Sequence, residues 1–301
     1  MFSGCGTALV TPFRSDGSLD EEALRRLVRR QIEGGINFLV PCGTTGESPT
    51  LTREEHLRVV EITIEEATGP GVPVLAGAGG YNTHEVIELG RRCEELGANG
   101  LLSVTPYYNR PTQEGLFQHY LAIAEAIRIP IIVYSVQART GVNVEPETLQ
   151  RLSTIPNVVG VKEASGNIAQ MAAILHRVPA SFTVLSGDDA VTLPLIALGG
   201  KGLISVASNI IPREMTELTR HCLNGDFESA RQLQRQWLPL MEVNFVESNP
   251  MPVKWALARM GLIEPVYRLP MVAPKPASQQ RIESVLESNH LLQRAAVGRS
   301  Q

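Results

Sequence analysis

The sequence lacks the usual marks of a secreted, metal-binding or membrane protein. Its four cysteines are scattered and form no CxxC pair, which indicates free thiols in a reducing compartment. The six histidines include no HxH and no HExxH, so no metal-ligand spacing is present. The first residues lack the charged and then apolar plan of a signal peptide, and no apolar run is long enough to span a bilayer. We therefore expect a cytoplasmic protein with no metal and no membrane partner.

A strong excess of charge is also missing. The 301 residues carry a formal net charge of −4, which does not suggest nucleic acid as a partner. No Pro/Gly/Ser-rich linker divides the chain, and a hydrophobic content of 43% is ample for a large core. We expect one barrel domain over residues 1–225 and a helical C-terminal extension over residues 226–301.

Short apolar runs alternate with amphipathic stretches along the first 225 residues. The runs predict eight strands, near residues 6–10, 37–41, 72–76, 100–104, 129–134, 158–162, 182–185 and 202–206. This alternation favours a parallel sheet, and eight such units in about 200–250 residues match a (β/α)₈ barrel, the TIM barrel. A doubly wound open sheet is the alternative, but no GxGxxG motif follows an early strand.

Helix boundaries are also predicted from local patterns. Ser18 with Glu21, and Thr52 with Glu55, have the spacing of a capping box at the start of a helix. After the eighth strand, helices are expected around residues 213–223, 226–240, 252–260 and 278–292. Residues 295–301 are expected to be frayed.

A lysine closes the otherwise apolar sixth strand. Because such a run indicates a strand buried on both faces, Lys162 should lie at a strand end that opens into a cleft. Alternation predicts that Val158, Gly160 and Lys162 share one side, with Gly160 leaving room below the amine. A desolvated amine is easier to deprotonate than one in water, which makes Lys162 a candidate Schiff-base nucleophile. A lysine that snorkels to solvent is the alternative.

Polar residues follow other predicted strands. Two threonines, Thr44 and Thr45, stand in a Gly-flanked turn whose N–H groups could hold a carboxylate. Tyr134 ends the fifth strand and could pass protons, while the nearby Arg139 offers bidentate recognition of a carboxylate. Since the strand ends of such a barrel meet at one face, we expect these groups to converge.

Five motifs in order carry a family resemblance: GTTGES (43–48), VTPYYNRP (104–111), GVKEA (160–164), LSGDD (185–189) and NPMPVKW (249–255). From residue 2 to about residue 270, the chain resembles the dihydrodipicolinate synthase family of pyruvate-dependent class I aldolases. The resemblance implies that Lys162 forms an imine with pyruvate. It also implies that Tyr134, Thr44 and Tyr108 form a proton relay, with Tyr108 reaching into a neighbouring subunit.

The resemblance further implies how the substrates are held. Thr45, with Thr44, would bind the pyruvate carboxylate, and Arg139 would bind the carboxylate of the second substrate, L-aspartate-4-semialdehyde. Gly187 and Ile204 would line the pocket. The product is 4-hydroxy-tetrahydrodipicolinate, on the diaminopimelate route of lysine biosynthesis. Family members are usually homotetramers, arranged as dimers of dimers, and need no cofactor beyond the covalent imine.

Two other functions share some of these features. A sister aldolase, such as N-acetylneuraminate lyase or a 2-keto-3-deoxy sugar acid aldolase, would also have Lys162 and Tyr134. The combination of Thr44, Thr45, Tyr108 and Arg139 favours the synthase. A barrel that binds a keto acid without turnover is a rival of another class.

The chain departs from the family pattern at two places. Ser135-Val136-Gln137 stands where Asn-Val-Pro is usual, and the loss of proline frees the backbone of that loop. The family's allosteric lysine pocket is matched at His56, Glu85 and Tyr107. It differs at two further positions, Arg53 and Tyr81.

Overall fold

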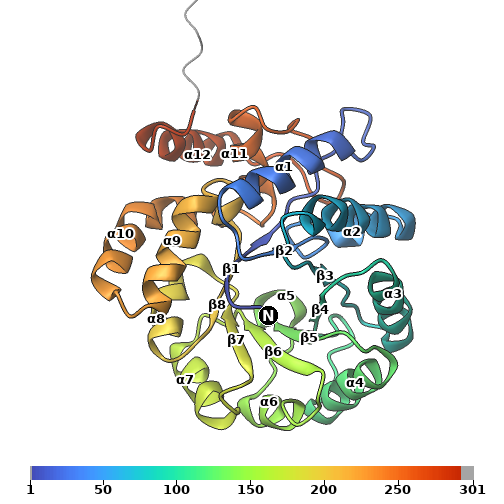
Figure 1. The fold of residues 1–301 in the computed structure, drawn as a ribbon. Helices are drawn as coiled ribbons and strands as arrows, with labels where there is room; N and C mark the ends of the chain where they lie inside the picture. Colours follow the sequence, from blue (N-terminus) through green and yellow to red (C-terminus); the bar gives the residue numbers. More distant parts are fainter. Residues whose placement is uncertain (1, 293–301) are drawn as a thin grey trace, which may run out of the picture.

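The computed structural model describes residues 2–292 and confirms a (β/α)₈ barrel with a C-terminal helical part (Figure 1). All neighbouring strands are parallel, in the order β2-β1-β8-β7-β6-β5-β4-β3. The two end strands meet through a parallel bridge between Leu39 and Val74, and the N–H of Gly77 donates to the carbonyl of Pro41 at 2.9 Å. These contacts close the barrel.

Each strand overlaps one of the predicted apolar runs. The eight strands are β1 (Gly4–Ala8), β2 (Phe38–Val40), β3 (Leu75–Gly77), β4 (Gly100–Val104), β5 (Ile131–Ser135), β6 (Val158–Glu163), β7 (Thr183–Ser186) and β8 (Gly202–Ser205). Their side chains are almost entirely buried on both faces, as expected when helices cover a parallel sheet.

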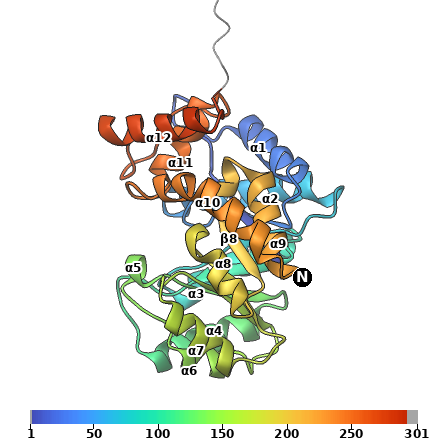
Figure 2. The same ribbon diagram turned by 90° about the vertical axis from the view of Figure 1, so that its left-hand side faces the viewer.

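Helices alternate with the strands and surround them. They are α1 (Glu21–Glu33), α2 (Arg53–Thr68), α3 (Thr83–Glu95), α4 (Gln113–Ala126), α5 (Gln137–Thr140), α6 (Pro146–Leu152), α7 (Ile168–Arg177), α8 (Thr192–Ala197) and α9 (Pro212–Leu223). Three further helices, α10 (Phe227–Val243), α11 (Met251–Arg259) and α12 (Pro276–Ser288), form the C-terminal part. In both views α11 and α12 lie at the same end of the molecule as α1 (Figures 1 and 2). Residues 295–301, expected to be frayed, lie outside the described residues. Among residues 2–292, no helix has both the length and the apolar character required to cross a bilayer.

One of the two predicted capping boxes is confirmed. The N–H of Glu55 donates to Thr52 Oγ1 at 3.2 Å, and the N–H of Thr52 donates to Glu55 Oε2 at 3.0 Å. The Ser18 box is wrong: α1 is capped by Asp20, which accepts from the N–H of Ala23 at 3.0 Å. Ser18 lies two residues before this cap, and its hydroxyl donates to Asp16 Oδ1 in the preceding turn.

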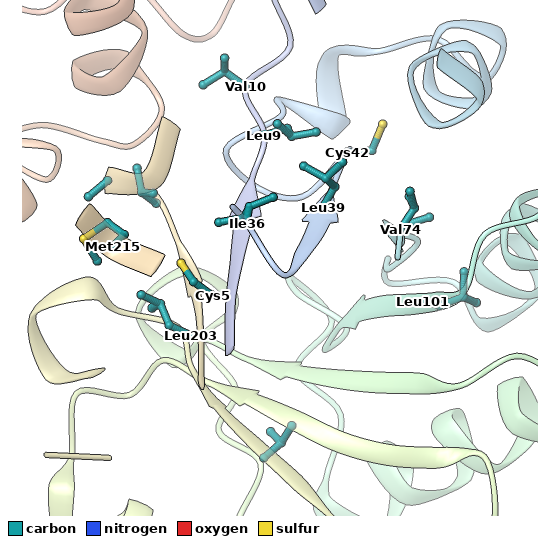
Figure 3. Close-up of a cluster of buried hydrophobic side chains, with 14 of the residues drawn as sticks. Cys5, Leu9, Val10, Ile36, Leu39, Cys42, Val74, Leu101, Leu203 and Met215 are labelled. Atoms are coloured by element: carbon teal, nitrogen blue, oxygen red, sulfur yellow. The ribbon is translucent and has the colours of Figure 1, made fainter. Parts of the chain in front are cut away.

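Two buried clusters stabilise the barrel. The larger lies between the strands and the helices and includes Cys5, Leu39, Leu101, Leu203 and Met215 (Figure 3). The smaller fills the barrel interior and contains Phe2, Ala8, Phe38, Val40, Leu75, Leu102, Ile132, Tyr134, Val136, Leu185 and Ile204. The interior is therefore packed with side chains, and space for a ligand remains only at the strand ends.

The expectation for Gly160 is wrong. A Cβ at this position would lie 2.4 Å from the carbonyl oxygen of Thr183, so the glycine permits close approach of β7 and leaves no room below the amine. The pairing of β5 with β6 also shifts by one residue, because Val159 is an extra residue in the ladder. For this reason Val158 belongs to the outer cluster, not to the side that Lys162 faces.

Candidate active site

Lys162 and Tyr134 are neighbours at the ends of adjacent strands. They are register partners across β6 and β5, and such partners point to the same face of a parallel sheet. Lys162 Nζ lies 4.0 Å from the centre of the Tyr134 ring. Both residues are buried, with exposed fractions of 5% and 6%. The amine is thus enclosed beside an aromatic ring at the position expected of a barrel nucleophile.

A cavity of about 400 Å³ opens above this pair. Six of the predicted site residues line it: Thr44, Thr45, Tyr134, Arg139, Lys162 and Gly187. An amine, a phenol, two hydroxyls and a guanidinium therefore face one space. This set can form an imine, move protons and hold two carboxylates.

Gly187 makes room for the lysine side chain. A Cβ at this position would lie 3.1 Å from Lys162 Cε and 2.5 Å from Ala164 Cβ. A larger residue would clash with Ala164 and press on the Lys162 side chain, so glycine fits the packing at this position.

The Thr44–Thr45 pair lies in a tight turn after β2. The N–H of Gly46 donates to the carbonyl of Gly43 at 3.1 Å, and the N–H of Glu47 donates to the carbonyl of Thr44 at 3.2 Å. Glu47 closes this turn in the left-handed region, with φ of +52°. The Thr45 hydroxyl accepts a hydrogen bond of 2.9 Å from Asn249 Nδ2. The turn is therefore fixed by its own backbone and from the C-terminal part of the chain.

Arg139 lies on the short helix α5, directly after β5. Its Nη2 donates to the carbonyl of Asn249 at 3.0 Å. Gln137 occupies the first position of α5, where the family's usual proline would also fit a helix, so the helix forms without it. Ser135 Oγ accepts from the N–H of Val144 at 3.2 Å and ties the loop to the start of α6.

Asn249 was not predicted as a site residue. It is buried, lines the cavity and bridges Thr45 to Arg139, and its own Oδ1 has no hydrogen-bond partner among residues 2–292. Its only signal in the sequence is its place at the head of the NPMPVKW motif. Its partner Thr45 is 204 residues away, so local pattern could not show the contact.

Two predicted residues lie outside the cavity. Tyr108 is 93% exposed in the loop between β4 and α4, and its φ is +67°. Ile204 packs in the inner cluster with Tyr134, and Val206, two residues further on, lines the cavity instead.

The residues of the predicted lysine pocket are divided. His56 and Tyr107 line a second cavity of about 610 Å³, which also reaches Thr44, Tyr134 and Arg139 but not Lys162. Glu85 is exposed on α3 and does not line it.

Burial lowers the pKa of His56 to about 4, and its Nε2–H donates to the carbonyl of Gly77 at 2.8 Å. Burial raises the pKa of Tyr107, whose ring packs edge-on against Tyr81 at 5.3 Å. We assign the chemistry to the smaller cavity, because it contains the amine.

Two buried acids lie next to residues of the site, but their side chains do not line its cavity. Glu163 points away from the cavity and accepts from the N–H of Ser165 and from Gln170 Nε2, and burial raises its pKa. Asp189 accepts from Ser205 Oγ, and burial raises its pKa to about 6. In the part of the chain that the structure describes, no group of three or more His, Cys, Asp or Glu side chains could hold a metal ion.

The geometry agrees with comparisons to known proteins. Residues 1–289 match the model of the dihydrodipicolinate synthetase family. A 4-hydroxy-tetrahydrodipicolinate synthase of Koribacter versatilis is 52% identical, with 98% of both chains covered. A crystal structure of dihydrodipicolinate synthase from Aquifex aeolicus has a TM-score of 0.95 and 43% identity, and covers 98% of this chain and 100% of that one. A monomeric dihydrodipicolinate synthase variant has a TM-score of 0.94 and 46% identity, with 97% and 98% covered.

Proposed function

The chain belongs to the dihydrodipicolinate synthetase family and has 4-hydroxy-tetrahydrodipicolinate synthase activity, and we propose that it condenses pyruvate with L-aspartate-4-semialdehyde through an imine on Lys162. The observation that carries the proposal is the buried Lys162 amine, 4.0 Å from the Tyr134 ring, in a cavity with two threonines and an arginine. The enzyme is a lyase of the diaminopimelate route.

The first stage joins pyruvate to the enzyme. The neutral amine of Lys162 attacks the ketone carbon, and water leaves as the imine forms. Thr44 and Thr45 hold the carboxylate of pyruvate through the turn after β2. The imine then accepts the electron pair of a methyl C–H bond as the proton departs, which gives an enamine.

The second stage uses the aldehyde. The enamine carbon attacks the aldehyde carbon of the semialdehyde, whose carboxylate is bound by Arg139. The amino group of that substrate then attacks the imine carbon, closes the ring and releases Lys162. Gly187 keeps room for the lysine chain during these steps, and Ile204 supports the site from below.

Proton transfers are assigned to a relay of Tyr134, Thr44 and Tyr108. General acid–base groups of this kind contribute roughly 10²–10⁴-fold to rate. Because Tyr108 is almost fully exposed and does not line the cavity of its own chain, we propose that it completes the site of a second copy of the chain. The proposed assembly is a homotetramer, a dimer of dimers.

The covalent imine acts as the electron sink, so the proposed mechanism requires no cofactor. The four cysteines are all buried as free thiols, which favours a reducing compartment, and we propose the cytoplasm.

We also propose that the cavity at His56 and Tyr107 binds lysine, with Glu85 at its rim. There the positive charge of Arg53 would meet the ligand's carboxylate.

A turnover assay with purified protein tests the function. Pyruvate and L-aspartate-4-semialdehyde should be consumed together, while N-acetylneuraminate should not be cleaved. Cleavage of the sugar acid would show a sister aldolase. Trapping of a pyruvate imine without turnover would show a binding barrel.

A further inference from the structure

A buried ion pair joins the turn of residues 43–47 after β2, here called the catalytic turn, to the C-terminal part of the chain. Lys254 Nζ, on α11, lies 2.6 Å from Glu47 Oε1, and the two side chains are 0% and 1% exposed. No other ion pair among residues 2–292 has both side chains so fully buried. The pair therefore differs in kind from the surface pairs on α1 and α2.

The surroundings of this pair are largely apolar. Lys254 Nζ lies 4.4 Å from the centre of the Phe13 ring and 5.4 Å from that of Tyr267. Within the described part of the chain, Glu47 Oε2 has no hydrogen-bond partner. Burial lowers the pKa of Lys254, while the charge of Glu47 opposes that change. Because desolvation largely cancels the attraction within such a pair, apolar residues of similar size would serve stability as well.

Both partners are connected to the active site. Glu47 ends the turn that holds Thr44 and Thr45, through the hydrogen bond from its N–H to Thr44. Lys254 lies on the first turn of α11, and its N–H donates to the carbonyl of Pro250 at 3.0 Å. The residue before that proline is Asn249, which bonds to Thr45 and accepts from Arg139.

We propose that Glu47 and Lys254 form a positioning pair for substrate binding. The pair fixes the start of α11 against the catalytic turn, so that Asn249 holds Thr45 and Arg139 at a set distance from Lys162. Neither Glu47 nor Lys254 lines the cavity that contains the amine. This inference rests on the proposed function only in assigning the two substrate carboxylates to Thr45 and Arg139.

The test compares two double variants that each remove an ion pair of α11. E47Q/K254M removes both buried charges at similar volume. R259M/E283Q is the matched control. It removes the half-exposed pair of Arg259 and Glu283, in which Arg259 Nε lies 3.0 Å from Glu283 Oε1. For each we would measure the melting temperature, the KM of each substrate, the rate of imine trapping at saturating pyruvate, and the crystal structure.

E47Q/K254M should fold, raise the KM of both substrates about 10-fold or more, and leave imine trapping at saturation within a few-fold of wild type. Its crystal structure should show the bond between Asn249 and Thr45 broken or lengthened. R259M/E283Q should leave both KM values unchanged. Unchanged KM values and an intact Asn249–Thr45 bond in E47Q/K254M would overturn the proposal.

A conservative variant covers the case in which the double variant fails to fold. E47D keeps both charges but shortens one side chain, so it should raise KM with little loss of stability. Wild-type KM values in a folded E47D protein would likewise overturn the proposal. A wild-type protein that does not turn over would count against the proposed function instead, while the Asn249–Thr45 bond would still report on the pair.

Discussion

Lys162 and Tyr134 face each other across adjacent parallel strands, and the lysine amine lies 4.0 Å from the centre of the tyrosine ring. The ring shields the amine from solvent on one side, and its hydroxyl belongs to the same cavity. A nucleophile and a candidate proton carrier are thus placed by strand register alone. Their positions should depend little on loop motion.

Borohydride reduction should identify the nucleophile. With pyruvate present, it should inactivate the enzyme irreversibly and add mass at Lys162, because it reduces the imine to a stable amine. Lys162→Ala should lose activity by several orders of magnitude and keep its fold. Lys201→Ala, at an exposed lysine, is the control and should remain active. Labelling at any other lysine would refute the assignment.

Arg139→Ala should impair the semialdehyde step. Loss of a charge-assisted contact to a carboxylate costs about 2 kcal/mol, or on the order of 30-fold in KM for that substrate. Imine trapping with pyruvate alone should hardly change. Arg139→Lys should recover only part of the loss, because it keeps the charge but not the fork geometry. An equal effect on both steps would show that Arg139 acts through the structure of α5.

Mixing two inactive variants tests the role of Tyr108. If each Tyr108 serves a second copy, co-expressed Lys162→Ala and Tyr108→Phe chains should form mixed dimers with one complete site. Random pairing would restore roughly a quarter of wild-type activity. If Tyr108 served its own chain, no mixed dimer would contain a complete site, and activity would stay at the level of the single variants.

Stability should fall in mild acid because of His119. Its ring is buried, with Nδ1 2.9 Å from Thr83 Oγ1, and burial lowers its pKa from 6.5 to about 4. As pH falls, His119 is protonated in the unfolded chain at a higher pH than in the folded one. The stability that neutral His119 contributes is therefore present above pH 6.5 and is lost as pH falls toward 4. The loss amounts to about 3 kcal/mol.

Urea unfolding of wild type and His119→Gln between pH 4 and 7 measures this contribution. The slope of stability against pH should be smaller in the variant. Asp189 acts in the opposite direction, because its raised pKa makes the folded state bind the proton more tightly between about pH 4 and 6. Since Asp189 is present in both proteins, its effect cancels in the comparison. Equal slopes would show that the pKa of His119 is the same in the folded and the unfolded chain.

Gly160→Ala should destabilise the barrel. The new methyl group would meet the carbonyl of Thr183 at 2.4 Å, and forced overpacking of this kind costs about 1–3 kcal/mol. Gly69→Ala is the matched control, because its φ is −60° and no atom of the described residues lies within 4 Å of the added Cβ. That change should leave stability equal or slightly higher. Thermal unfolding compares the two, and equal melting temperatures would contradict the packing argument.

The barrel and the nucleophile could be predicted because their signals are local. Apolar runs of one strand's length, separated by amphipathic stretches, predict the parallel strands, and a lysine at the end of such a run must lie at an open end. The Thr44–Thr45 turn and Tyr134 could be found for the same reason.

Contacts between distant segments could not be predicted from local pattern. The partners in Asn249–Thr45 and Lys254–Glu47 are 204 and 207 residues apart. The error at Gly160 has a similar origin, because the space beside a strand depends on where its neighbour's backbone passes. At the start of α1, Ser18 and Asp20 are both possible acceptors for the free N–H groups of the first turn, and the sequence pattern did not rank Asp20 above Ser18.

The contacts of Asn249 and Lys254 with the turn after β2 determine when, during synthesis of the chain, the active site can be completed. A nascent chain that has emerged only through α9, or one clipped by a protease before α11, already contains its nucleophile. It would nevertheless bury a carboxylate with no counter-ion and leave the Thr45 hydroxyl without its donor. Catalytic competence should therefore appear only when synthesis is nearly complete, and fragments should be inert and readily degraded.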